Sequence, residues 1–415
     1  MVIGRGFTDR FLSEAEARAI FAEGVAQLDL TGKRVLVIIP DSTRSGPIPL
    51  CFRALTELIR PVAAQLDFMI ALGTHLPMGE SSICRHLGIT AEERATTYGD
   101  VQVFNHIYTE GLRALGAIPA AEIAELTGGL FGEEVRVQVN ARLWDYDHVM
   151  VCGPVFPHEI AGFSGGNKYF FPGVAGPEVI DLTHWLGALI TNVKVIGQQR
   201  TPIRAILDRA AAMIPMERSC FSMVVKGDDN LAGLYFGSPE ESQAAAAELS
   251  AQINVVYKDR QYRLVISIMP ELYDDIWTAG KGMYKLEPVV ADGGTLIIYA
   301  PHIDEVSYTH GAVLDRIGYH VRDYFLANME RYVGVPRGVM AHATHVKGTG
   351  TYANGVERPR VSVVLATGVS PERCERINLG YMDPTTLDLD AYRHREDEGI
   401  LVVERAGEML HLLRA

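Results

Sequence analysis

The chain has 415 residues, of which 48% are hydrophobic and 21% charged, so at about 150 residues per domain it should form two or three packed domains, which excludes global disorder. Its 38 basic and 51 acidic residues give a net charge of −13, which argues against a nucleic-acid partner. Charged residues interrupt the segment from Met1 to Arg18, and no run approaches the ~18 uncharged apolar residues that cross a bilayer. We therefore expect a cytoplasmic protein that binds no nucleic acid and no membrane.

The cysteine and glycine contents give two further indications. The five cysteines are an odd number and form no C-x-x-C pair, which is typical of a reduced, cytosolic protein and indicates neither a disulfide framework nor a cysteine zinc site. Glycine, with 40 residues, makes up close to a tenth of the chain, against an average of about 7%. Because no low-complexity run holds them, these glycines should lie at particular turns.

The N-terminal part of the chain alternates helix and strand patterns. A capping box, Ser13-Glu14-Ala15-Glu16, opens an amphipathic helix that runs to about Leu28. The continuous apolar run 34–39 then predicts a strand buried on both faces, and a polar turn ends it. A helix over 50–58 and a second apolar strand over 68–72 follow. This alternation is typical of an α/β domain with a parallel sheet.

The same cycle continues toward the C-terminus. Further strands are predicted over 147–152, 263–268, 295–299, 361–365 and 400–403. A second capping box at Ser238 opens an alanine-rich helix, and a helix over about 277–290 leads to a turn at 292–294. We predict two Rossmann-like α/β domains, residues 1–270 and 271–415, with the active site in the interdomain cleft, because ligands bind at the carboxyl ends of parallel strands.

Polar residues follow directly after the predicted strands, where α/β enzymes keep their functional side chains. The first group is Asp41-Ser42-Thr43-Arg44, and the second is His75, which follows Gly73 and Thr74. An ordinary turn or helix cap explains the tetrapeptide equally well, and a lone histidine in a loop is weak evidence of function.

The segment from Gly153 to Gly176 contains six glycines and three prolines in 24 residues, which no regular helix or strand interior favours. Within it, Ser164-Gly165-Gly166 precedes Lys168. Free amide groups therefore stand beside a cation, a combination suited to a phosphate or another anion. The spacing is not that of a Walker A loop, which argues against an ATPase.

Two residues of this region are candidates for holding a cofactor or a metal. A lysine in a glycine-rich, aromatic-flanked loop can be the covalent attachment point of a cofactor, whereas most lysines are solvated at the surface, so both interpretations of Lys168 stay open. His184 offers an imidazole to nickel, copper, zinc or iron, although a lone histidine is more often structural. No second histidine accompanies it at helical spacing, so a metal here would need ligands from distant residues or from a bound cofactor.

Together these motifs resemble the nickel-dependent lactate racemase family, over about residues 10–300. The resemblance rests on Asp41-Ser42-Thr43-Arg44, Gly73-Thr74-His75, the block from Pro157 to Gly173, His184, and the segment from Asp275 to Lys281 with Asp292-Gly293-Gly294. Its most specific part is the spacing of ten residues from His158 to Lys168 and of sixteen from Lys168 to His184.

The resemblance implies a role for each matching residue. The N-terminal domain, 1–270, would hold a nickel-pincer nucleotide, pyridinium-3,5-bisthiocarboxylic acid mononucleotide, attached at Lys168, and His184 would complete the coordination of the nickel. His75 and His158 would be the catalytic acid/base pair. The residues that would contact the cofactor or its phosphate are Asp41, Ser42, Thr43, Ser164, Gly165 and Gly166.

The implied activity is that of an isomerase, a racemase or epimerase that inverts C2 of a 2-hydroxy acid by reversible hydride transfer, with the cofactor-biosynthesis enzymes as partners. Removing the C2 hydrogen as a proton would leave a carbanion beside the negatively charged carboxylate, which is unfavourable. Hydride transfer avoids this carbanion. Arg44 and Lys281 would bind the substrate carboxylate. Thr278 stands where the family's lactate enzymes carry glutamine, so the sequence allows a larger 2-hydroxy acid as the substrate as readily as lactate. The aromatic residues 169–171 would line its pocket or belong to the core.

Two other functions account for parts of the same pattern. The glycine-rich loop alone would serve a non-catalytic nucleotide- or phosphate-binding protein. Lys168 alone would serve a pyridoxal-phosphate enzyme as its Schiff-base lysine.

Overall fold

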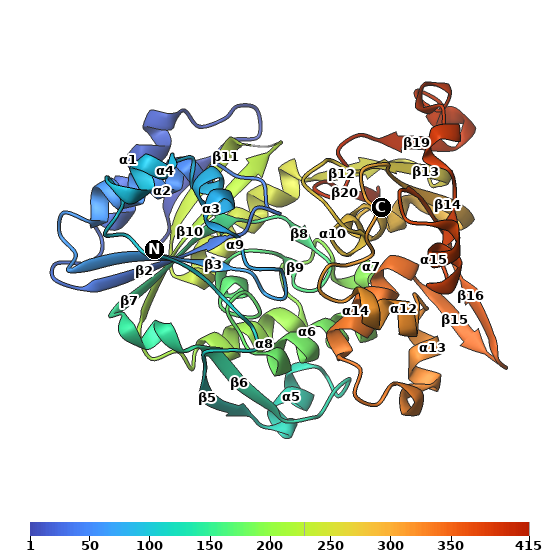
Figure 1. Ribbon diagram of the computed structural model, residues 1–415, viewed down its shortest axis with the longest axis horizontal. Helices are drawn as coiled ribbons and strands as arrows, with labels where there is room; N and C mark the ends of the chain where they lie inside the picture. Colours follow the sequence, from blue (N-terminus) through green and yellow to red (C-terminus); the bar gives the residue numbers. More distant parts are fainter. Residues whose placement is uncertain (228, 415) are drawn as a thin grey trace. The chain divides into compact units, whose positions relative to one another are not determined.

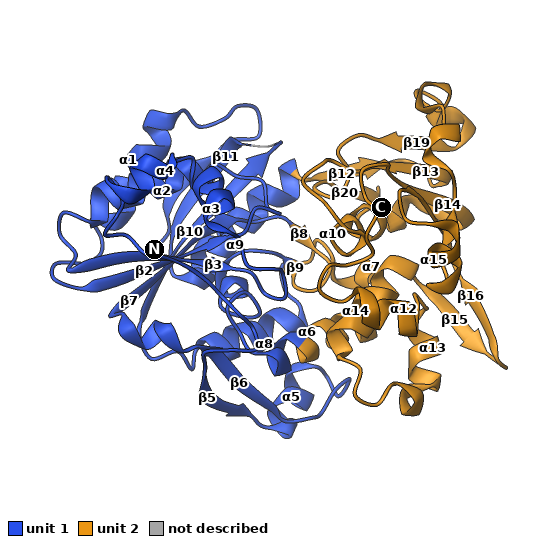
Figure 2. Cartoon of the chain, viewed as in Figure 1, with its two compact units in different colours: residues 1–156, 163–180, 199–253 blue, residues 157–162, 181–198, 254–415 orange. Residues whose placement is uncertain are grey.

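The chain forms two compact units, each an α/β structure built on parallel strands, as the sequence predicts (Figure 1; Figure 2). The structure, a computed structural model, describes residues 1–227 and 229–414. The first unit comprises residues 1–156, 163–180 and 199–253, and the second comprises residues 157–162, 181–198 and 254–415.

The first unit is built on a seven-stranded sheet. Its order is β1 (Ile3–Gly6), β11 (Asn230–Gly237), β10 (Glu217–Lys226), β7 (His148–Pro154), β2 (Arg34–Pro40), β3 (Gln65–Ala71) and β4 (Val103–Asn105). The five strands from β10 to β4 are parallel, while β11 and β1 add an antiparallel edge. The strands predicted over 34–39, 68–72 and 147–152 are thus confirmed as β2, β3 and β7. These three lie inside the sheet and are almost wholly buried, which is why their sequences are continuously apolar.

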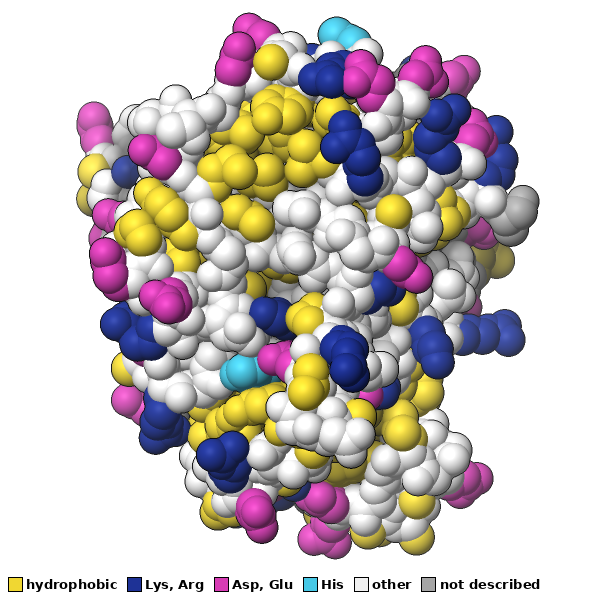
Figure 3. Space-filling model, turned by 90° about the vertical axis from the view of Figure 1, so that its right-hand side faces the viewer, with side chains coloured by type: hydrophobic (Ala, Val, Ile, Leu, Met, Phe, Trp, Pro, Cys, Tyr) yellow, Lys and Arg dark blue, Asp and Glu magenta, His cyan; other side chains and the backbone are white. Residues whose placement is uncertain are grey.

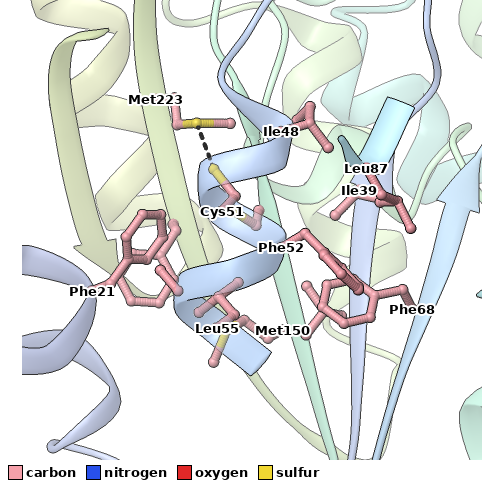
Figure 4. Packing of buried hydrophobic residues seen from close by; sticks show 14 of the residues in the cluster. Phe21, Ile39, Ile48, Cys51, Phe52, Leu55, Phe68, Leu87, Met150 and Met223 are labelled. Carbon is pink, nitrogen blue, oxygen red and sulfur yellow. Dashed lines mark hydrogen bonds between the residues drawn. The ribbon is translucent and has the colours of Figure 1, made fainter. Parts of the chain in front are cut away.

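Helices cover both faces of this sheet. On one face the core joins α1 (Glu14–Val25), α2 (Ile48–Ile59) and α3 (Glu80–Leu87) to the strands, with Phe52 and Phe68 ring centroids 4.9 Å apart (Figure 4). On the other face Val224 packs against α9 (Pro239–Ile253), whereas its neighbours Met223 and Val225 join the first core. This alternation is the period of two expected of a strand between two layers.

Capping explains where two of these helices begin. The hydroxyl of Ser13 accepts from the amide of Glu16 at 3.2 Å, and the Glu16 carboxylate accepts from the Ser13 amide at 2.9 Å, so the predicted capping box is confirmed. At α9 the Ser238 hydroxyl likewise accepts from the Glu241 amide at 3.1 Å.

The remaining elements of the first unit are short. They are α4 (Ala91–Ala95), β5 (Leu112–Ile118), α5 (Ala120–Leu126), β6 (Val135–Asn140), η1 (Ala141–Asp145), η2 (Gly166–Tyr169) and α8 (Pro202–Ala211). The two-stranded β8 (Pro157–His158) and β9 (Gly162–Phe163) ladder and the helix α6 (Pro177–Ile190) contain residues of both units. Within the described residues, no helix is both long enough and apolar enough to cross a membrane.

The second unit is built on a five-stranded, wholly parallel sheet. Its order is β18 (Gly380–Tyr381), β17 (Ser362–Thr367), β14 (Val290–Ala300), β13 (Tyr262–Ile268) and β19 (Ile400–Val403). The strands predicted over 263–268, 295–299, 361–365 and 400–403 are confirmed. The other elements are α7 (Asn192–Val195), β12 (Val255–Lys258), α10 (Ile276–Ala279), α11 (Lys281–Tyr284), η3 (Glu287–Val289), α12 (Gly311–Ile317), α13 (Arg322–Ala327), η4 (Met329–Tyr332), α14 (Arg337–Lys347), β15 (Gly350–Ala353), β16 (Val356–Pro359), α15 (Pro371–Arg376), η5 (Pro384–Thr386), η6 (Leu389–Ala391), η7 (Glu396–Glu398) and β20 (Leu410–Leu413).

On one face of this second sheet only a few side chains are fully buried. Ile266, Ile297 and Ala366 form a small core there with Leu387, and the hydrophobic side chains around it stay partly exposed. Figure 3 presents the side of the molecule on which β13, β14 and β19 lie in Figure 1, and hydrophobic side chains gather there in one patch.

The continuous helix predicted over about 277–290 is wrong. The chain instead forms three short pieces, α10, α11 and η3, although Gly280 between the first two keeps a right-handed helical conformation with φ −51° and ψ −24°. A Cβ on Gly280 would lie 2.7 Å from the Val346 side chain, and one on Gly282 would lie 2.2 Å from Ser267 Oγ. The turn predicted at 292–294 falls inside β14, where Gly293 has φ +76°.

Each unit is built from three separate segments of the chain, so the two units are not an N-terminal and a C-terminal half. The predicted domains meet at residues 270 and 271, whereas the long segments of the compact units meet at 253 and 254. The segment 254–270 lies in the second unit with β12 and β13, whose partners β20 and β14 come later in the chain. Pairing between such distant strands leaves no local mark in the sequence.

We expect Phe52→Ala to lower the free energy of unfolding of the first unit by about 3–5 kcal/mol, because Phe52 is 1% exposed and its removal leaves a cavity against Phe68. Chemical denaturation followed by circular dichroism would measure the change. The matched control is Phe11→Ala, since Phe11 is 44% exposed and its loss should cost little. Equal losses in the two variants would contradict this account of the core.

Candidate functional site

The turns after β2 and β3 meet at one edge of the first sheet. The two strands are adjacent and parallel, with Pro40 opposite Ala71, so both chains leave the sheet at its carboxyl edge. There Oδ2 of Asp41 contacts Nδ1 of His75 directly. The other carboxylate oxygen of Asp41 accepts from the Thr43 amide at 3.1 Å and from the Thr43 hydroxyl at 2.7 Å. Asp41 therefore holds both its own turn and the imidazole.

Asp41 is 5% exposed, and its environment decides its charge. Burial opposes ionisation, but the charges of His75 and Arg44 and the hydrogen bonds from His75 and Thr43 outweigh it and lower the pKa of the carboxyl. An ionised Asp41 occupies Nδ1 of His75, which leaves Nε2 as the ring nitrogen for proton exchange with a bound molecule.

Arg44 and Ser42 occupy the same turn with different exposure. Arg44 is half-buried, and its guanidinium donates to the carbonyl and the hydroxyl of Thr43 at 3.4 and 3.3 Å. Ser42 is exposed. The turn thus presents a partly shielded cation next to the Asp41 and His75 pair.

The glycine-rich loop is anchored by Asn167, which is 1% exposed. The Asn167 amide donates to Asp208 on α8 at 2.9 Å and to Glu240 on α9 at 2.6 Å, and its oxygen accepts from Arg218 at 3.2 Å. Both polar atoms of its side chain therefore have partners within the protein, which positions the residue that follows it, Lys168.

Buried donors from two helices hold the carbonyls of the same loop. Arg204 on α8 donates to Gly165 at 3.2 Å and also to Phe163, and Gln243 on α9 donates to Ser164 at 3.3 Å. Neither Arg204 nor Asn167 stands out as a functional residue in the sequence, because an arginine in a helix and an asparagine in a loop are ordinary residues until the fold brings them together.

The hydroxyl of Ser164 is used inside the loop. It donates to the Pro154 carbonyl at 3.1 Å and accepts from the Phe156 amide at 2.9 Å, while the Ser164 amide donates to Phe156 at 2.8 Å. The side chain predicted to contact a phosphate therefore closes the base of the loop.

The glycines of the loop are needed for backbone conformation and close packing. Gly165 and Gly166 have φ of +84° and +57°. A Cβ on Gly165 would lie 2.4 Å from a methyl group of Val155, and one on Gly166 would lie 2.6 Å from the Pro239 carbonyl. At these two positions the neighbouring atoms belong to the protein, so packing alone accounts for glycine.

The loop and the histidine turn are joined by hydrogen bonds. Lys168 lies in η2 and is half-buried, and its carbonyl accepts from the Gly173 amide at 3.1 Å. The Gly173 carbonyl in turn accepts from Gly73, two residues before His75, at 3.0 Å. Burial raises the pKa of Tyr169, on which the charges of Arg44 and Asp41 also act. The structure thus brings the Lys168 loop to the same sheet edge as Asp41, Arg44 and His75.

The other predicted residues belong to the second unit. His158 is 8% exposed, and its Nδ1 accepts from the Ile160 amide at 3.1 Å. A neutral His158 therefore carries its proton on Nε2. The carboxylate of Glu159 lies 3.3 Å from the same Nδ1.

His184 lies on α6 near the buried imidazole of His342. The pKa of His342 is well below its usual value because of burial and the nearby His345, His310 and His184. The His342 ring stacks on Trp277 at 3.9 Å. Across the residues that the structure describes, no three His, Cys, Asp or Glu side chains come together as a metal-binding group. A single imidazole at His184 fits a metal whose other ligands come from a bound cofactor.

Thr278 and Lys281 flank a buried helix cap. Asp275 caps α10, accepting from the Thr278 amide at 2.9 Å and from its hydroxyl at 2.8 Å. The Thr278 hydroxyl is therefore engaged in this cap. Lys281 begins α11, with its Nζ 4.2 Å from the ring centroid of Tyr273.

The fold and these groups define an α/β protein with an aspartate and histidine pair beside a lysine-bearing, glycine-rich loop. Residues 10–196 match the family model of the lactate racemase N-terminal domain. The chain is 24% identical over 283 residues to the lactate racemase of Thermoanaerobacterium thermosaccharolyticum, covering 66% of this chain and 61% of that protein. It is 26% identical over 280 residues to the lactate racemase of Lactiplantibacillus plantarum, covering 65% and 60%. The matches thus span about 60% of the length of these curated relatives.

Two solved structures share the fold of the chain. A crystal structure of a protein from Thermotoga maritima aligns with a TM-score of 0.90 and 32% identity, over 98% of this chain and 100% of that one. The lactate racemase apoprotein from T. thermosaccharolyticum aligns with a TM-score of 0.71 over 100% of this chain and 94% of that one, and at 19% identity this shows the fold alone. The chain belongs to the lactate racemase family.

We expect Gly165→Ala to destabilise the first unit by about 1–3 kcal/mol more than Gly129→Ala, because only the first substitution adds a steric overlap. Gly129 has a similar φ of +82°, and a Cβ there would meet nothing within 4 Å, so its substitution isolates the backbone cost. Urea denaturation would measure both changes. Equal losses would mean that packing around the loop is looser than described.

We also expect Asp41 to contribute a pH-dependent part of the stability. Since its pKa is lower in the folded protein than the value of about 3.9 in the unfolded chain, its stabilisation is present above that pH and is lost as the pH falls through it toward the lower folded pKa. Urea unfolding at about pH 6 and about pH 3 should show a smaller loss for Asp41→Asn than for the wild type. Asp9→Asn, at an exposed position, should behave as the wild type does.

Proposed function

We propose that the protein is a racemase or epimerase that inverts C2 of a 2-hydroxy acid. The observation that carries the proposal is the contact of buried Asp41 with half-buried His75 next to the Lys168 loop, in a chain whose residues 10–196 match the lactate racemase N-terminal domain. The names of the two curated relatives support the same class of reaction.

Inversion at a carbon needs an acid or base for each of the two enantiomers. His75, oriented by Asp41, serves one, with Nε2 as the nitrogen that takes or returns the proton of the substrate hydroxyl. His158 serves the other, and in its neutral form it carries the exchangeable proton on Nε2 because Nδ1 is already an acceptor. The proposal requires both histidines to act on one substrate.

Cationic side chains would bind the negatively charged carboxylate of the substrate. Arg44 is half-buried, so its charge is less screened than that of a solvated arginine, and a guanidinium binds a carboxylate through two parallel hydrogen bonds. Lys281 supplies a second cation in this proposal. A fixed carboxylate would orient C2 and its hydroxyl toward the histidines.

The residues present fit a tethered cofactor. Lys168, held in place by Asn167 and half-buried, would carry a nickel-pincer nucleotide, and His184 would bind its nickel. Such a cofactor, when bound, supplies a pyridinium carbon that accepts hydride. Its biosynthetic enzymes would then be required partners.

The proposed substrate is lactate or a larger 2-hydroxy acid. The Thr278 hydroxyl is engaged with Asp275, so this position presents a smaller and less polar group than the glutamine of the family's lactate enzymes. The aromatic residues Phe170 and Phe171 are fully buried and belong to the core, so they do not limit the substrate directly.

We expect the protein, co-expressed with the cofactor-building enzymes, to contain nickel and to carry a covalent mass addition at Lys168, whereas Lys168→Arg should carry neither. Intact mass, peptide mapping and metal analysis would measure this. Lys226→Arg, at an exposed lysine, is the matched control and should keep both. An unmodified Lys168 under these conditions would refute the proposed cofactor, and an absorbance abolished by borohydride would indicate pyridoxal phosphate instead.

We further expect His75→Asn and His158→Asn each to lower the rate of racemisation by about 100-fold or more, because each removes one acid/base group. Chiral chromatography of a panel of 2-hydroxy acids would measure the rates in both directions. Glu271→Gln, at an exposed position of the second unit, should keep the full rate. Activity retained in both histidine variants would favour a non-catalytic nucleotide-binding role.

A further inference from the structure

Each of the two histidines proposed as acid/base groups has a carboxylate at its Nδ1. Asp41 contacts Nδ1 of His75 in the first unit. In the second unit, Oε2 of Glu159 lies 3.3 Å from Nδ1 of His158, and these two side chains are 16% and 10% exposed. The proposed function uses Asp41 to orient His75 and gives Glu159 no role, so the second carboxylate is the group that needs an explanation.

A tight hairpin turn fixes Glu159 beside His158. The strand β8 ends at His158, the turn comprises residues 159–161, and β9 begins at Gly162, whose φ is +78°. Ile160 in this turn is 2% exposed and packs on α6, where a Cβ on Gly187 would lie 3.2 Å from the Cδ1 of Ile160. Because the interior packing holds Ile160, the backbone of the turn is fixed, and with it the position of Glu159.

The Nδ1 atom of His158 has two neighbours that need opposite protonation states. The Ile160 amide donates to it at 3.1 Å, which requires a lone pair on Nδ1. The Glu159 carboxylate can only accept, which requires a proton on Nδ1. In the neutral imidazole with its proton on Nε2, the carboxylate therefore faces a lone pair. Attraction between the two side chains arises only when Nδ1 carries a proton.

Acid catalysis by His158 needs this proton on Nδ1. A neutral imidazole that gave up its Nε2 proton would become an imidazolate anion, which is too basic to form near neutral pH. The imidazolium instead transfers its Nε2 proton to the substrate oxygen, while the electron pair of the N–H bond stays on Nε2. The neutral imidazole formed in this way keeps its proton on Nδ1, facing Glu159, and its Nε2 can take a hydroxyl proton in the opposite direction of the reaction.

The other charged groups of the elements around this imidazole have different partners or roles. On α6, Glu178 pairs with Arg136 at 2.6 Å, and Asp181 accepts from an amide at the start of α14 at 2.9 Å. His184 is the remaining titratable side chain of α6, and β9 has none. Since Glu159 is 16% exposed, water screens its charge only in part. Glu159 is thus the carboxylate that the described part of the second unit places at this imidazole.

We infer that Glu159 is a positioning residue for the proposed reaction. It holds the Nδ1 proton of His158, so that Nε2 of His158 can both give and take the proton of the substrate hydroxyl. This inference rests on the proposed function, in which His158 is an acid/base group. It assigns to Glu159 the part that Asp41 plays toward His75, and it provides a carboxylate and histidine pair for each of the two enantiomers.

Nitrogen-15 NMR of the full chain labelled at histidine tests the contact without substrate or turnover. The titration midpoint of His158 should fall by roughly one pH unit in Glu159→Gln, because an adjacent carboxylate favours the charged imidazolium. The signal is identified by its loss in His158→Asn. The exposed control Glu271→Gln should titrate as the wild type does. Equal midpoints in the wild type and Glu159→Gln would overturn the inference.

Racemisation kinetics of the cofactor-loaded enzyme test the consequence for the reaction. Glu159→Gln should lower kcat by about tenfold or more and leave KM nearly unchanged, because the carboxylate acts on a proton transfer and not on substrate binding. The amide has the same shape as the carboxylate, so Tm should stay close to that of the wild type. Glu159→Asp keeps the charge and should retain more of kcat than Glu159→Gln. Equal losses in these two variants would show that the charge has no part in the reaction.

The variants separate this inference from the proposed function. If His158→Asn lowers the rate and Glu159→Gln does not, the proposed function stands and the role of Glu159 is refuted. If His158→Asn keeps the full rate, His158 is not an acid/base group, and both fail. A lower titration midpoint together with a lower kcat in Glu159→Gln is the result that supports the inference.

Discussion

The parallel pairing of β2 with β3 and β7 is the constraint on which the first unit depends. These strands are buried on both faces, so polar groups gather in the turns at their ends. Since the strands are parallel, the turns that carry Asp41 and His75 and the loop that carries Lys168 all leave the sheet at one edge. A contact such as that between Asp41 and His75, 34 residues apart, follows from this direction.

Buried polar side chains divide into two kinds in this protein: those whose polar atoms all have partners, and those that leave an atom without a partner among the described residues. Asn167 and Ser164 find all their partners inside the protein, so they fix the backbone of the glycine-rich loop. Asn192 and Glu287, by contrast, each leave one side-chain oxygen without a partner among the residues described.

The seven strands predicted from continuous apolar runs all form, because a strand buried on both faces has a local signature. The helix predicted over 277–290 forms only as three short pieces, and its Gly280 and Gly282 lie in close contact with Val346 and Ser267, which the local pattern does not reveal. Likewise, Thr278 looks like a pocket residue in the sequence, and only the folded chain shows its hydroxyl engaged with Asp275. Errors of this kind arise where a distant neighbour decides the role of a residue.

The sequence by itself determined the α/β class, the positions of most buried strands, and the family, through motifs at 41–44, 73–75 and 157–173. These features are local, because apolar runs and short spacings are written in consecutive residues. Only the tertiary structure decided that Asp41 orients His75, that Arg204 and Asn167 hold the loop of Lys168, and that Gly187 makes room for Ile160 in the turn beside His158. Each of these depends on strand order and helix packing, which bring together residues whose separation along the chain carries no signal.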